Sequence, residues 1–396
     1  MKRYIYSLTV LLIVALCSFL FSTASIENKN AKNSIAKLSV SKKEISPIKI
    51  LCYPEKVTKN VVSKLDALLS KINKRNDFHG SLLVAKKGKI IYNNQVGTSD
   101  FRKKELLNEH SVFQLASVSK QFTAAAIMIL HEKKLLKLTD TVNTFFPKFP
   151  YENVTIKNLL NHTAGLPKYF WLAEHKWKKP NAPTNKEMMQ LIDESKVQRF
   201  FKPGRNFDYS NTAYLVLASI VEKVSGVSFQ EFAKQNIFDP LGMKNSYVYS
   251  YQNDSIPENQ IDGYRLYRGW RHLKIGSTIN DAIVGDKNVY STAEDLLKWI
   301  QGLNTGKLIS KESKELMYTK GKTHYGKHVP YGYGFRIKTD KENKIYHHGK
   351  WNGFRTGLTQ YIDDDLVVIV LEHTSYNGIA ALNNRVKNII AKNFKG

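Results

Sequence analysis

The sequence predicts an α+β fold in which an antiparallel sheet, built from both ends of the chain, is flanked by helices and carries an inserted helical lobe. The first observation is that short apolar runs typical of strands occur near both ends of the 396-residue chain. The second is that apolar residues recur with helical spacing between those runs. The length allows roughly two structural units, and we expect them to interleave in one domain.

The expected elements follow this division. Residues 80–85 and 89–92 flank a Lys-Lys-Gly turn, which predicts a β-hairpin near the amino end. Further strands are predicted at residues 331–337, 344–348, 353–362 and 366–372. Helices are predicted at residues 57–72, 117–136, 155–162, 186–194, 211–225, 294–302 and 380–394.

The amino end has the pattern of an export signal. A positive end, Met1-Lys2-Arg3, precedes the apolar run 8–21, and the small residues 22–24 offer a cleavage point. We therefore assign residues 1–24 to a signal peptide or, alternatively, to an N-terminal membrane anchor. Residues 25–55 are rich in Lys, Ser and Asn and are expected to form a flexible tether before a domain over residues 56–396. The predicted location is the periplasm, the cell surface or the extracellular space.

Cysteine content and charge narrow the class of protein. Only Cys52 remains after removal of the signal, which excludes a disulfide scaffold and a cysteine-built zinc site. The formal net charge is +26, with basic clusters at residues 86–89, 102–104 and 176–179. In an exported protein this charge favours an anionic envelope polymer or a membrane surface over nucleic acid, although a simple solvated lysine-rich surface explains it equally well.

A serine and a lysine three residues apart open the helix expected at 117–136. Ser117 and Lys120 would lie on one face of its first turn, where burial can lower the pKa of the lysine and let it accept the serine proton. The same four letters occur at residues 39–42, inside the expected tether. Ser39 has no packed wall around it there, so we assign the chemistry to Ser117.

Two further clusters complete the candidate site. Tyr209 and Asn211 follow a Pro-Gly turn and precede a helix; a phenol beside ammonium groups can lose its proton below its usual pKa, and the amide can orient a substrate. His347 and Gly349 lie on a predicted strand and are followed by Lys350. The glycine would let substrate lie against the strand edge, and the N–H group of Lys350 could complete an oxyanion hole.

These three clusters, in this order, resemble the motifs Ser-x-x-Lys, Tyr-Ser-Asn and His-x-Gly of the serine β-lactamase and penicillin-binding-protein superfamily, and within it the class C β-lactamase-related hydrolases. Further matching strings are LLNHTAGLP at 159–167, FDYSNTAYLVLASIVEKVSG at 207–226, IFDPLGMKNS at 237–246 and VYSTAEDLLKW at 289–299. The resemblance covers roughly residues 57–395 and implies a β-lactamase/transpeptidase-like fold.

The resemblance also implies roles. Ser117 would be the nucleophile that forms an acyl-enzyme, and Lys120 and Tyr209 would transfer protons. Asn211 would contact substrate, and the backbone N–H groups of Ser117 and Lys350 would form the oxyanion hole. The implied chemistry needs no metal and no cofactor.

One departure bears on substrate. Class C β-lactamases carry Lys-Thr-Gly where this chain has His347-His348-Gly349, and a histidine at the first position instead resembles D-alanyl-D-alanine carboxypeptidases, D-aminopeptidases and many esterases. An imidazole of ordinary pKa is only partly cationic at neutral pH, which predicts weak hydrolysis of penicillins.

We therefore expect an exported serine hydrolase that acts on an ester or a D-amino-acid amide or peptide. The alternatives are a true β-lactamase, a cell-wall D-alanyl-D-alanine carboxypeptidase, and a non-catalytic envelope-binding protein. Among other residues, His162 is expected to stabilise a turn by hydrogen bonding, and Trp171 and Trp270 are expected in loops.

Overall fold

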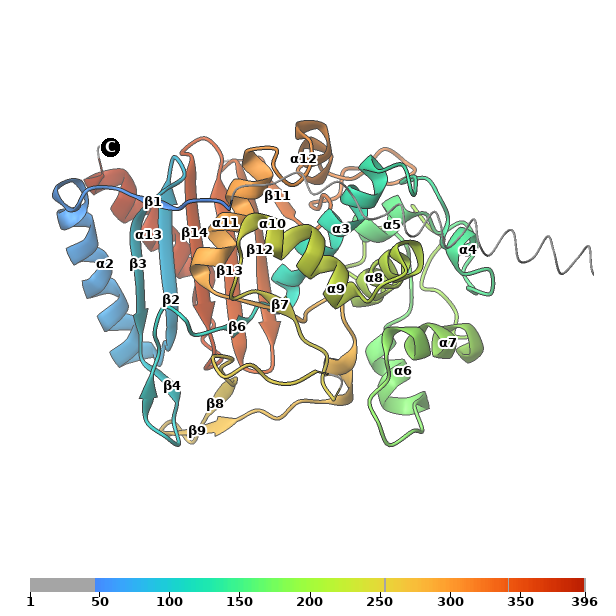
Figure 1. The fold of residues 1–396 in the computed structure, drawn as a ribbon, viewed down its shortest axis with the longest axis horizontal. Helices are drawn as coiled ribbons and strands as arrows, with labels where there is room; N and C mark the ends of the chain where they lie inside the picture. The colour runs from blue at the N-terminus through green and yellow to red at the C-terminus, as the bar shows by residue number, and fades with distance from the viewer. Residues whose placement is uncertain (1–46, 253, 341, 395–396) are drawn as a thin grey trace, which may run out of the picture. The chain divides into compact units, whose positions relative to one another are not determined.

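A seven-stranded sheet forms the centre of the computed structural model, which describes residues 47–394 except 253 and 341 (Figure 1). Its strand order is β1-β3-β2-β14-β13-β12-β11. These strands are β1 (Leu51–Cys52), β2 (Gly80–Lys86), β3 (Lys89–Val96), β11 (Arg336–Lys338), β12 (Lys344–Trp351), β13 (Phe354–Tyr361) and β14 (Leu366–Glu372). All neighbours are antiparallel except β1 and β3, which are parallel.

The two ends of the chain meet in the middle of this sheet. β2 pairs with β14 along its whole length, from Gly80 opposite Glu372 to Lys86 opposite Leu366. Every residue of β14 is buried, as expected for a strand that is covered on both faces. The predicted sheet of strands from both termini is confirmed.

β11 is shorter than the strand predicted at 331–337. Gly334 has φ +79°, and a Cβ atom there would lie 2.8 Å from Cα of Gln121. The chain therefore turns where Gly334 packs against the start of helix α3 (Lys120–Glu132), and Tyr331 forms an isolated antiparallel bridge with Arg336. Alternation of apolar residues alone did not reveal this turn.

Helices α2 (Glu55–Asn76) and α13 (Ile379–Asn393) cover one face of the sheet, at the left of Figure 1. Their apolar stripes pack with β2, β3 and β14 in a second hydrophobic core. The rings of Tyr53 and Phe394 meet edge to face at 4.9 Å. The strand β1 lies inside the range 25–55 that we assigned to the tether, so at least these two residues belong to the folded domain. The expected signal peptide and Ser39 lie outside the described residues.

The remaining helices form the opposite layer, seen in front of the sheet in Figure 1, and the helical lobe, at the right of the sheet. Its helices are α3 (Lys120–Glu132), α4 (Val142–Phe145), α5 (Ile156–Leu160), α6 (Tyr169–Lys176), α7 (Asn185–Ser195), α8 (Asn211–Ser225), α9 (Phe229–Ala233), α10 (Asp239–Leu241), α11 (Ala293–Asn304) and α12 (Lys311–Met317). Short helical turns are η1 (Ala116–Ser119), η2 (Lys234–Phe238) and η3 (Ile279–Ala282). Of these helices, α4, α6, α9, α10 and α12 were not predicted, and α6 places Trp171 on a helix instead of in a loop.

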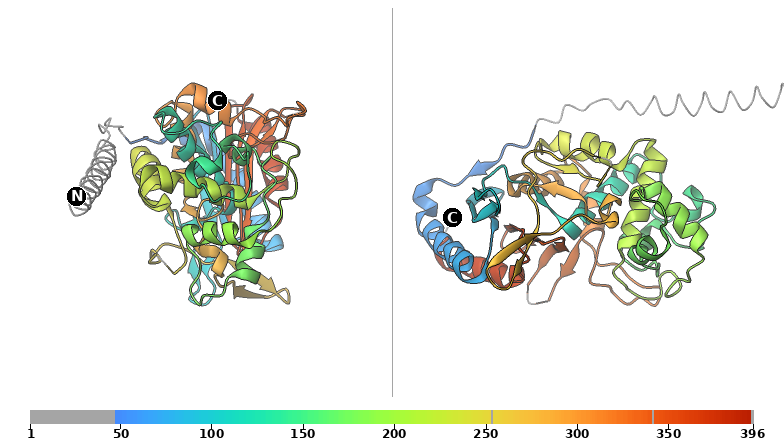
Figure 2. Two further views of the ribbon diagram at one scale, coloured as in Figure 1. Left: turned by 90° about the vertical axis from the view of Figure 1, so that its right-hand side faces the viewer. Right: turned by 90° about the horizontal axis from the view of Figure 1, so that it is seen from below.

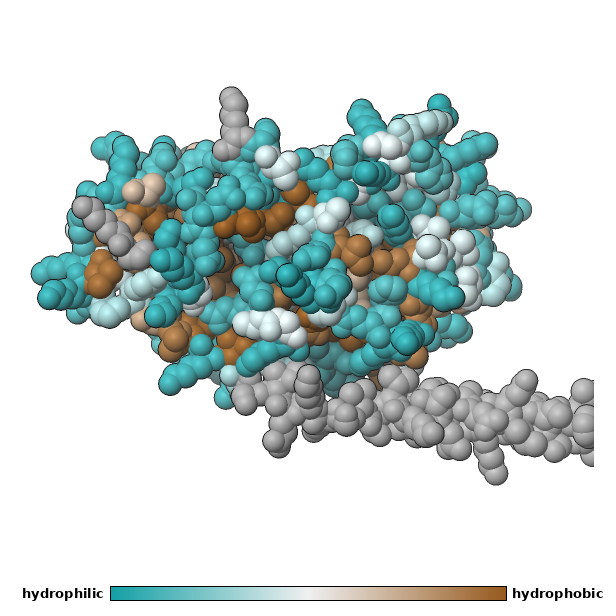
Figure 3. All heavy atoms as spheres, turned by 90° about the horizontal axis from the view of Figure 1, so that it is seen from above, coloured by the Kyte–Doolittle hydropathy of each residue, from teal (hydrophilic) through white to brown (hydrophobic). Residues whose placement is uncertain are grey.

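Small sheets complete the described part of the chain. They are built from β4 (Thr98–Asp100) with β5 (Glu105–Leu106), β8 (Tyr264–Tyr267) with β9 (Arg271–Lys274), and β10 (Val289–Ser291) between β6 (Phe113–Gln114) and β7 (Tyr247–Val248). Hydrophilic side chains cover most of the face shown in Figure 3, as the composition leads one to expect. In the described residues no single helix has the length and apolar character of a membrane span, although α8 and residues 229–241 do so together as a pair bent by 81°.

Candidate active site

Ser117 lies where the chain passes from strand β6 into helix α3, on the turn η1. Every residue from 111 to 130 is buried except Ser117, which is partly exposed. The preceding residue, Ala116, has φ +49°, a left-handed conformation that costs free energy for a residue with a Cβ atom. The fold thus presents one hydroxyl at the surface of a tightly packed segment and holds the backbone before it in a strained conformation.

Lys120 is the first residue of α3 and is completely buried. Its Nζ lies 3.4 Å from Oγ of Ser117, and it donates to Oδ1 of Asn211 at 2.7 Å and to the carbonyl oxygen of Asp286 at 2.8 Å. Burial lowers the pKa of Lys120 to about 8, with Arg336 acting in the same direction and the Asp286 carboxylate opposing it. A useful fraction of Lys120 is therefore neutral at mildly alkaline pH and able to accept the serine proton.

Tyr209 approaches the same lysine from the segment before α8. Nζ of Lys120 lies 5.0 Å from the centre of its ring. Burial raises the pKa of Tyr209, while the Ser117 hydroxyl and the Arg336 guanidinium act against that shift. The expected ionisation of the phenol below its ordinary pKa is wrong, because desolvation outweighs the neighbouring positive charges. At neutral pH Tyr209 is a phenol that can donate or relay a proton.

Asn211 begins helix α8, just after the Ser210 side chain that caps it by accepting from the Ala213 N–H group. Its amide oxygen is occupied by Lys120. The amide NH₂ group can still donate a hydrogen bond to a substrate carbonyl. Asn211 can therefore contact substrate, as predicted, but only through this NH₂ group.

The third predicted cluster lies on β12, where His347 is buried and engaged by the protein itself. Its Nδ1 lies 2.8 Å from the His348 carbonyl oxygen, so Nδ1 carries the proton and Nε2 accepts from the Tyr331 hydroxyl at 2.9 Å. Burial, with Lys120 and Arg336 nearby, holds the pKa of His347 well below its usual value. The expectation that His347 is partly cationic at neutral pH is wrong.

Gly349 and Lys350 follow on the same strand. A Cβ atom at Gly349 would lie 2.3 Å from the carbonyl oxygen of Leu115, which accepts from the Thr356 hydroxyl of β13 at 2.6 Å. The glycine therefore permits close packing of β12 against the segment that precedes Ser117. We had inferred a different reason for a glycine at this position, namely that it lets substrate lie against the strand edge. The side chain of Lys350 is exposed.

Comparison with known proteins shows the family of the chain. Residues 65–392 match the family model described as Beta-lactamase. The chain belongs to the β-lactamase family. It is 33% identical over 325 residues to penicillin-binding protein 4* of Bacillus subtilis, covering 78% of this chain and 71% of that one. It is also 24% identical over 372 residues to the teichoic acid D-alanine hydrolase of Staphylococcus aureus, covering 93% and 87%.

A solved structure shows the same fold. The penicillin-binding protein from Bacillus halodurans superposes with a TM-score of 0.70 at 26% identity, covering 81% of this chain and 99% of that one. The chain is thus a serine hydrolase of the β-lactamase fold.

Within this β-lactamase-family site, Arg336 is a cation that the sequence analysis missed. Its guanidinium carbon lies 5.1 Å from the centre of the Tyr209 ring, and its charge lowers the pKa values of Lys120 and His347. Arg336 lies at the start of the edge strand β11, on a stretch that we read only as an apolar strand. The spacing of apolar residues gives no signal that this side chain reaches the site.

A second missed feature is the buried pair Asp286 and Lys287, next to Lys120. Asp286 gives its carbonyl oxygen to Lys120 and its carboxylate to Lys287, at 3.2 Å. Nζ of Lys287 also donates to the Tyr169 hydroxyl at 2.7 Å and lies 5.2 Å from the centre of the Trp351 ring. Through these contacts the pair connects α6, which carries Tyr169, to the end of β12, which carries Trp351.

His162 supports Tyr209, in keeping with its predicted role as a turn-stabilising hydrogen-bonder. Its carbonyl oxygen accepts from the Asp208 N–H group at 2.9 Å, and its Nδ1 accepts from the Ser210 N–H group at 3.1 Å. The rings of His162 and Tyr209 lie 4.4 Å apart. Because Nδ1 accepts, Nε2 carries the proton, and among the described residues this buried nitrogen has no hydrogen-bond partner.

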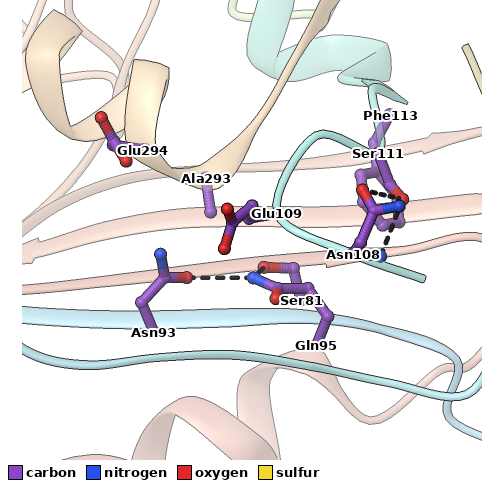
Figure 4. Close-up of a pocket in the computed structure, with 9 residues that line it drawn as sticks. All are labelled: Ser81, Asn93, Gln95, Asn108, Glu109, Ser111, Phe113, Ala293 and Glu294. Carbon is purple, nitrogen blue, oxygen red and sulfur yellow. Dashed lines mark hydrogen bonds between the residues drawn. The ribbon is translucent and has the colours of Figure 1, made fainter. Parts of the chain in front are cut away.

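Other polar groups lie outside this site. Figure 4 shows a small polar pocket lined by Gln95, Glu109, Ser111 and neighbours, none of them a predicted site residue. Among the described residues, Asp77, His79 and His272 bring ligand-type atoms within 4.8 Å of one another. However, Nδ1 of His79 accepts from the Thr98 N–H group at 2.9 Å, so its Nε2 carries a proton toward Asp77 and is not free to bind a metal.

Proposed function

We propose that this protein is an exported serine hydrolase of the class C β-lactamase-related type, which acts through an acyl-enzyme on Ser117 and hydrolyses an ester or a D-amino-acid amide or peptide. The observation that carries the proposal is the approach of Nζ of Lys120 to within 3.4 Å of the only partly exposed residue in the segment 111–130.

The reaction follows from the charges. Neutral Lys120 accepts the proton as Oγ of Ser117 forms a bond to the substrate carbonyl carbon. The negative oxygen that results is stabilised by the N–H groups of Ser117 and Lys350. The C–O or C–N bond then breaks, and Tyr209 passes a proton to the leaving group. Water attacks the acyl-enzyme through the same groups in reverse and releases the acid.

Arg336 supports a substrate that carries a carboxylate. A guanidinium is always protonated and binds carboxylates in a forked geometry, which a neutral imidazole does not provide. Two relatives support this range of substrates: one is named for penicillin binding and the other for hydrolysis of teichoic acid D-alanine. The carboxylate of a D-alanyl peptide could contact Arg336, so this residue favours a D-alanyl-D-alanine carboxypeptidase as the second candidate function.

Two experiments test the proposal. A serine-reactive acylating probe should label Ser117, and mapping of the label on Ser39, or labelling that survives Ser117→Ala, would exclude it. Purified protein should then be assayed with a short acyl ester, an N-acetylated D-alanyl-D-alanine peptide and a cephalosporin. Failure to turn over any of these while the probe still labels Ser117 would favour a protein that binds envelope components without catalysis.

A further inference from the structure

Two neighbouring hairpins carry a concentration of exposed basic and apolar side chains. We call residues 98–106 and 264–274 the paired hairpins; they lie at the bottom of Figure 1 and are also seen at the lower edge of the left view in Figure 2. They are joined by Phe101, which stacks on His272 with ring centres 3.6 Å apart and an interplanar angle of 13°. This stacking contact fixes the two hairpins against each other.

The tip of the second hairpin has little contact with the rest of the described chain. All seven residues from 265 to 271 are exposed, and Trp270 is 72% exposed. A Cβ atom on Gly269 would meet nothing within 4 Å. Trp270 contributes nothing to the core, and with Leu266 and Tyr267 exposed on the same hairpin it belongs to a group of apolar side chains of the kind that marks an interaction surface.

The charges on the paired hairpins are strongly unbalanced. Seven basic side chains are present, Arg102, Lys103, Lys104, Arg265, Arg268, Arg271 and Lys274, against the two acidic ones Asp100 and Glu105. Lys103 pairs with Glu105 at 3.6 Å, and Lys274 pairs with Asp262 at 2.7 Å. Among the described residues no ion pair forms with Arg268 or Arg271, so the tip carries a net positive charge.

Apolar groups accompany these charges. Leu106 is 71% exposed on the first hairpin, and Leu266 and Tyr267 are each 40% exposed on the second. Trp and Tyr residues next to Arg residues are typical of protein surfaces that contact the interface of a bilayer. The aromatic rings lie at the level of the headgroups, and the guanidinium groups contact lipid phosphates. A soluble polyanion would need the charges and not the exposed rings.

We propose that the paired hairpins dock the domain onto a bilayer that contains anionic lipids, with Trp270 and Tyr267 in the headgroup layer and Arg268 and Arg271 on lipid phosphates. This surface is separate from Ser117 and does not depend on the proposed reaction.

The test is hydrogen–deuterium exchange of the full chain, with and without vesicles, read at the peptide that covers residues 264–274. This local signal is independent of any contribution that the apolar amino-terminal run makes to overall binding. Protection is expected with phosphatidylcholine vesicles that contain phosphatidylglycerol and is expected to be lost with pure phosphatidylcholine.

Variants identify the groups involved. Arg268→Gln/Arg271→Gln should weaken vesicle-induced protection about tenfold or more in lipid concentration, since each basic residue near an anionic surface contributes about fivefold. The matched control Lys186→Gln/Lys223→Gln removes the same charge from exposed positions elsewhere and should have no such effect. Trp270→Ser should also reduce protection, whereas Tyr325→Ser, at a site 80% exposed, should not.

Three results would overturn the proposal. The first is equal protection by polyphosphate with indifference to Trp270→Ser, which would assign the surface to a soluble polyanion. The second is protection that appears without lipid as protein concentration rises, which would assign it to a second copy of the chain. The third is no protection under any condition.

Discussion

The guanidinium of Arg336 lies over the ring of Tyr209, 5.1 Å from its centre, and so places a permanent positive charge beside the predicted proton relay. We expect Arg336→Ala to lower kcat/KM for a D-alanyl-D-alanine peptide about 10- to 100-fold, the usual effect of losing a hydrogen bond to a charged group. A short acyl ester without a carboxylate should lose much less. Steady-state kinetics on both substrates measure the difference.

Arg336→Lys is the control, since it keeps the charge without the forked geometry, and it should recover part of the loss. Equal losses on the ester and the peptide would instead mean that Arg336 serves only to hold Tyr209.

The pH dependence of kcat/KM should follow Lys120. Its pKa is lowered to about 8, and only the neutral form accepts the serine proton, so kcat/KM should rise with pH and level off above about 8. Arg336 contributes to that lowering, so Arg336→Ala should move the inflection to higher pH. Profiles measured between pH 5.5 and 9.5 test both statements. An inflection near pH 6.5 would show that His347 titrates, contrary to its buried, doubly hydrogen-bonded state.

Removal of the Tyr209 hydroxyl should slow turnover without preventing folding. We expect Tyr209→Phe to lower kcat by about 10²–10⁴-fold, the usual contribution of a positioned general acid or base. The measurement is kcat together with a thermal melting curve. Wild-type turnover in this variant would remove Tyr209 from the mechanism.

His162 offers a matched pair of substitutions. Asn places an amide oxygen where Nδ1 now accepts from Ser210, and it tolerates the left-handed conformation at φ +61°, whereas Gln does neither. We expect His162→Asn to keep kcat within a few-fold and His162→Gln to lose about 10- to 100-fold in kcat with KM nearly unchanged. If His162 acted only by packing its ring, the two variants would behave alike.

Gly349→Ala should destabilise the fold. The added methyl group would lie 2.3 Å from the Leu115 carbonyl oxygen, and strain of this kind typically costs about 1–3 kcal/mol in the free energy of unfolding. Gly276→Ala, at a position with nothing within 4 Å, is the control and should be neutral. Urea unfolding of both variants provides the comparison; equal stability would contradict the close packing of β12.

The sequence was sufficient for the parts of the fold that depend on periodicity. The helix from Asn211 and the strand Leu366–Glu372 lie where apolar spacing predicted them. The turn at Gly334 was missed because it depends on contact with α3, a tertiary feature. Arg336 and Asp286 were missed for the same reason, since only the fold brings these residues beside Lys120. The charge states of Tyr209 and His347 were wrong because they are set by burial, which a motif does not reveal.

The pairing of β2 with β14 has a consequence for how the molecule is assembled. An amino-terminal fragment that ends before β12 already contains Ser117, Lys120 and Tyr209, but it lacks β12, β13 and β14 and therefore the part of the main sheet that packs against η1. During synthesis Ser117 therefore stays in an incompletely ordered chain until the last strands have been made. Contacts of such large sequence separation are slow to form. The proposed hydrolase activity would thus report that the final strands had been made and had closed the sheet.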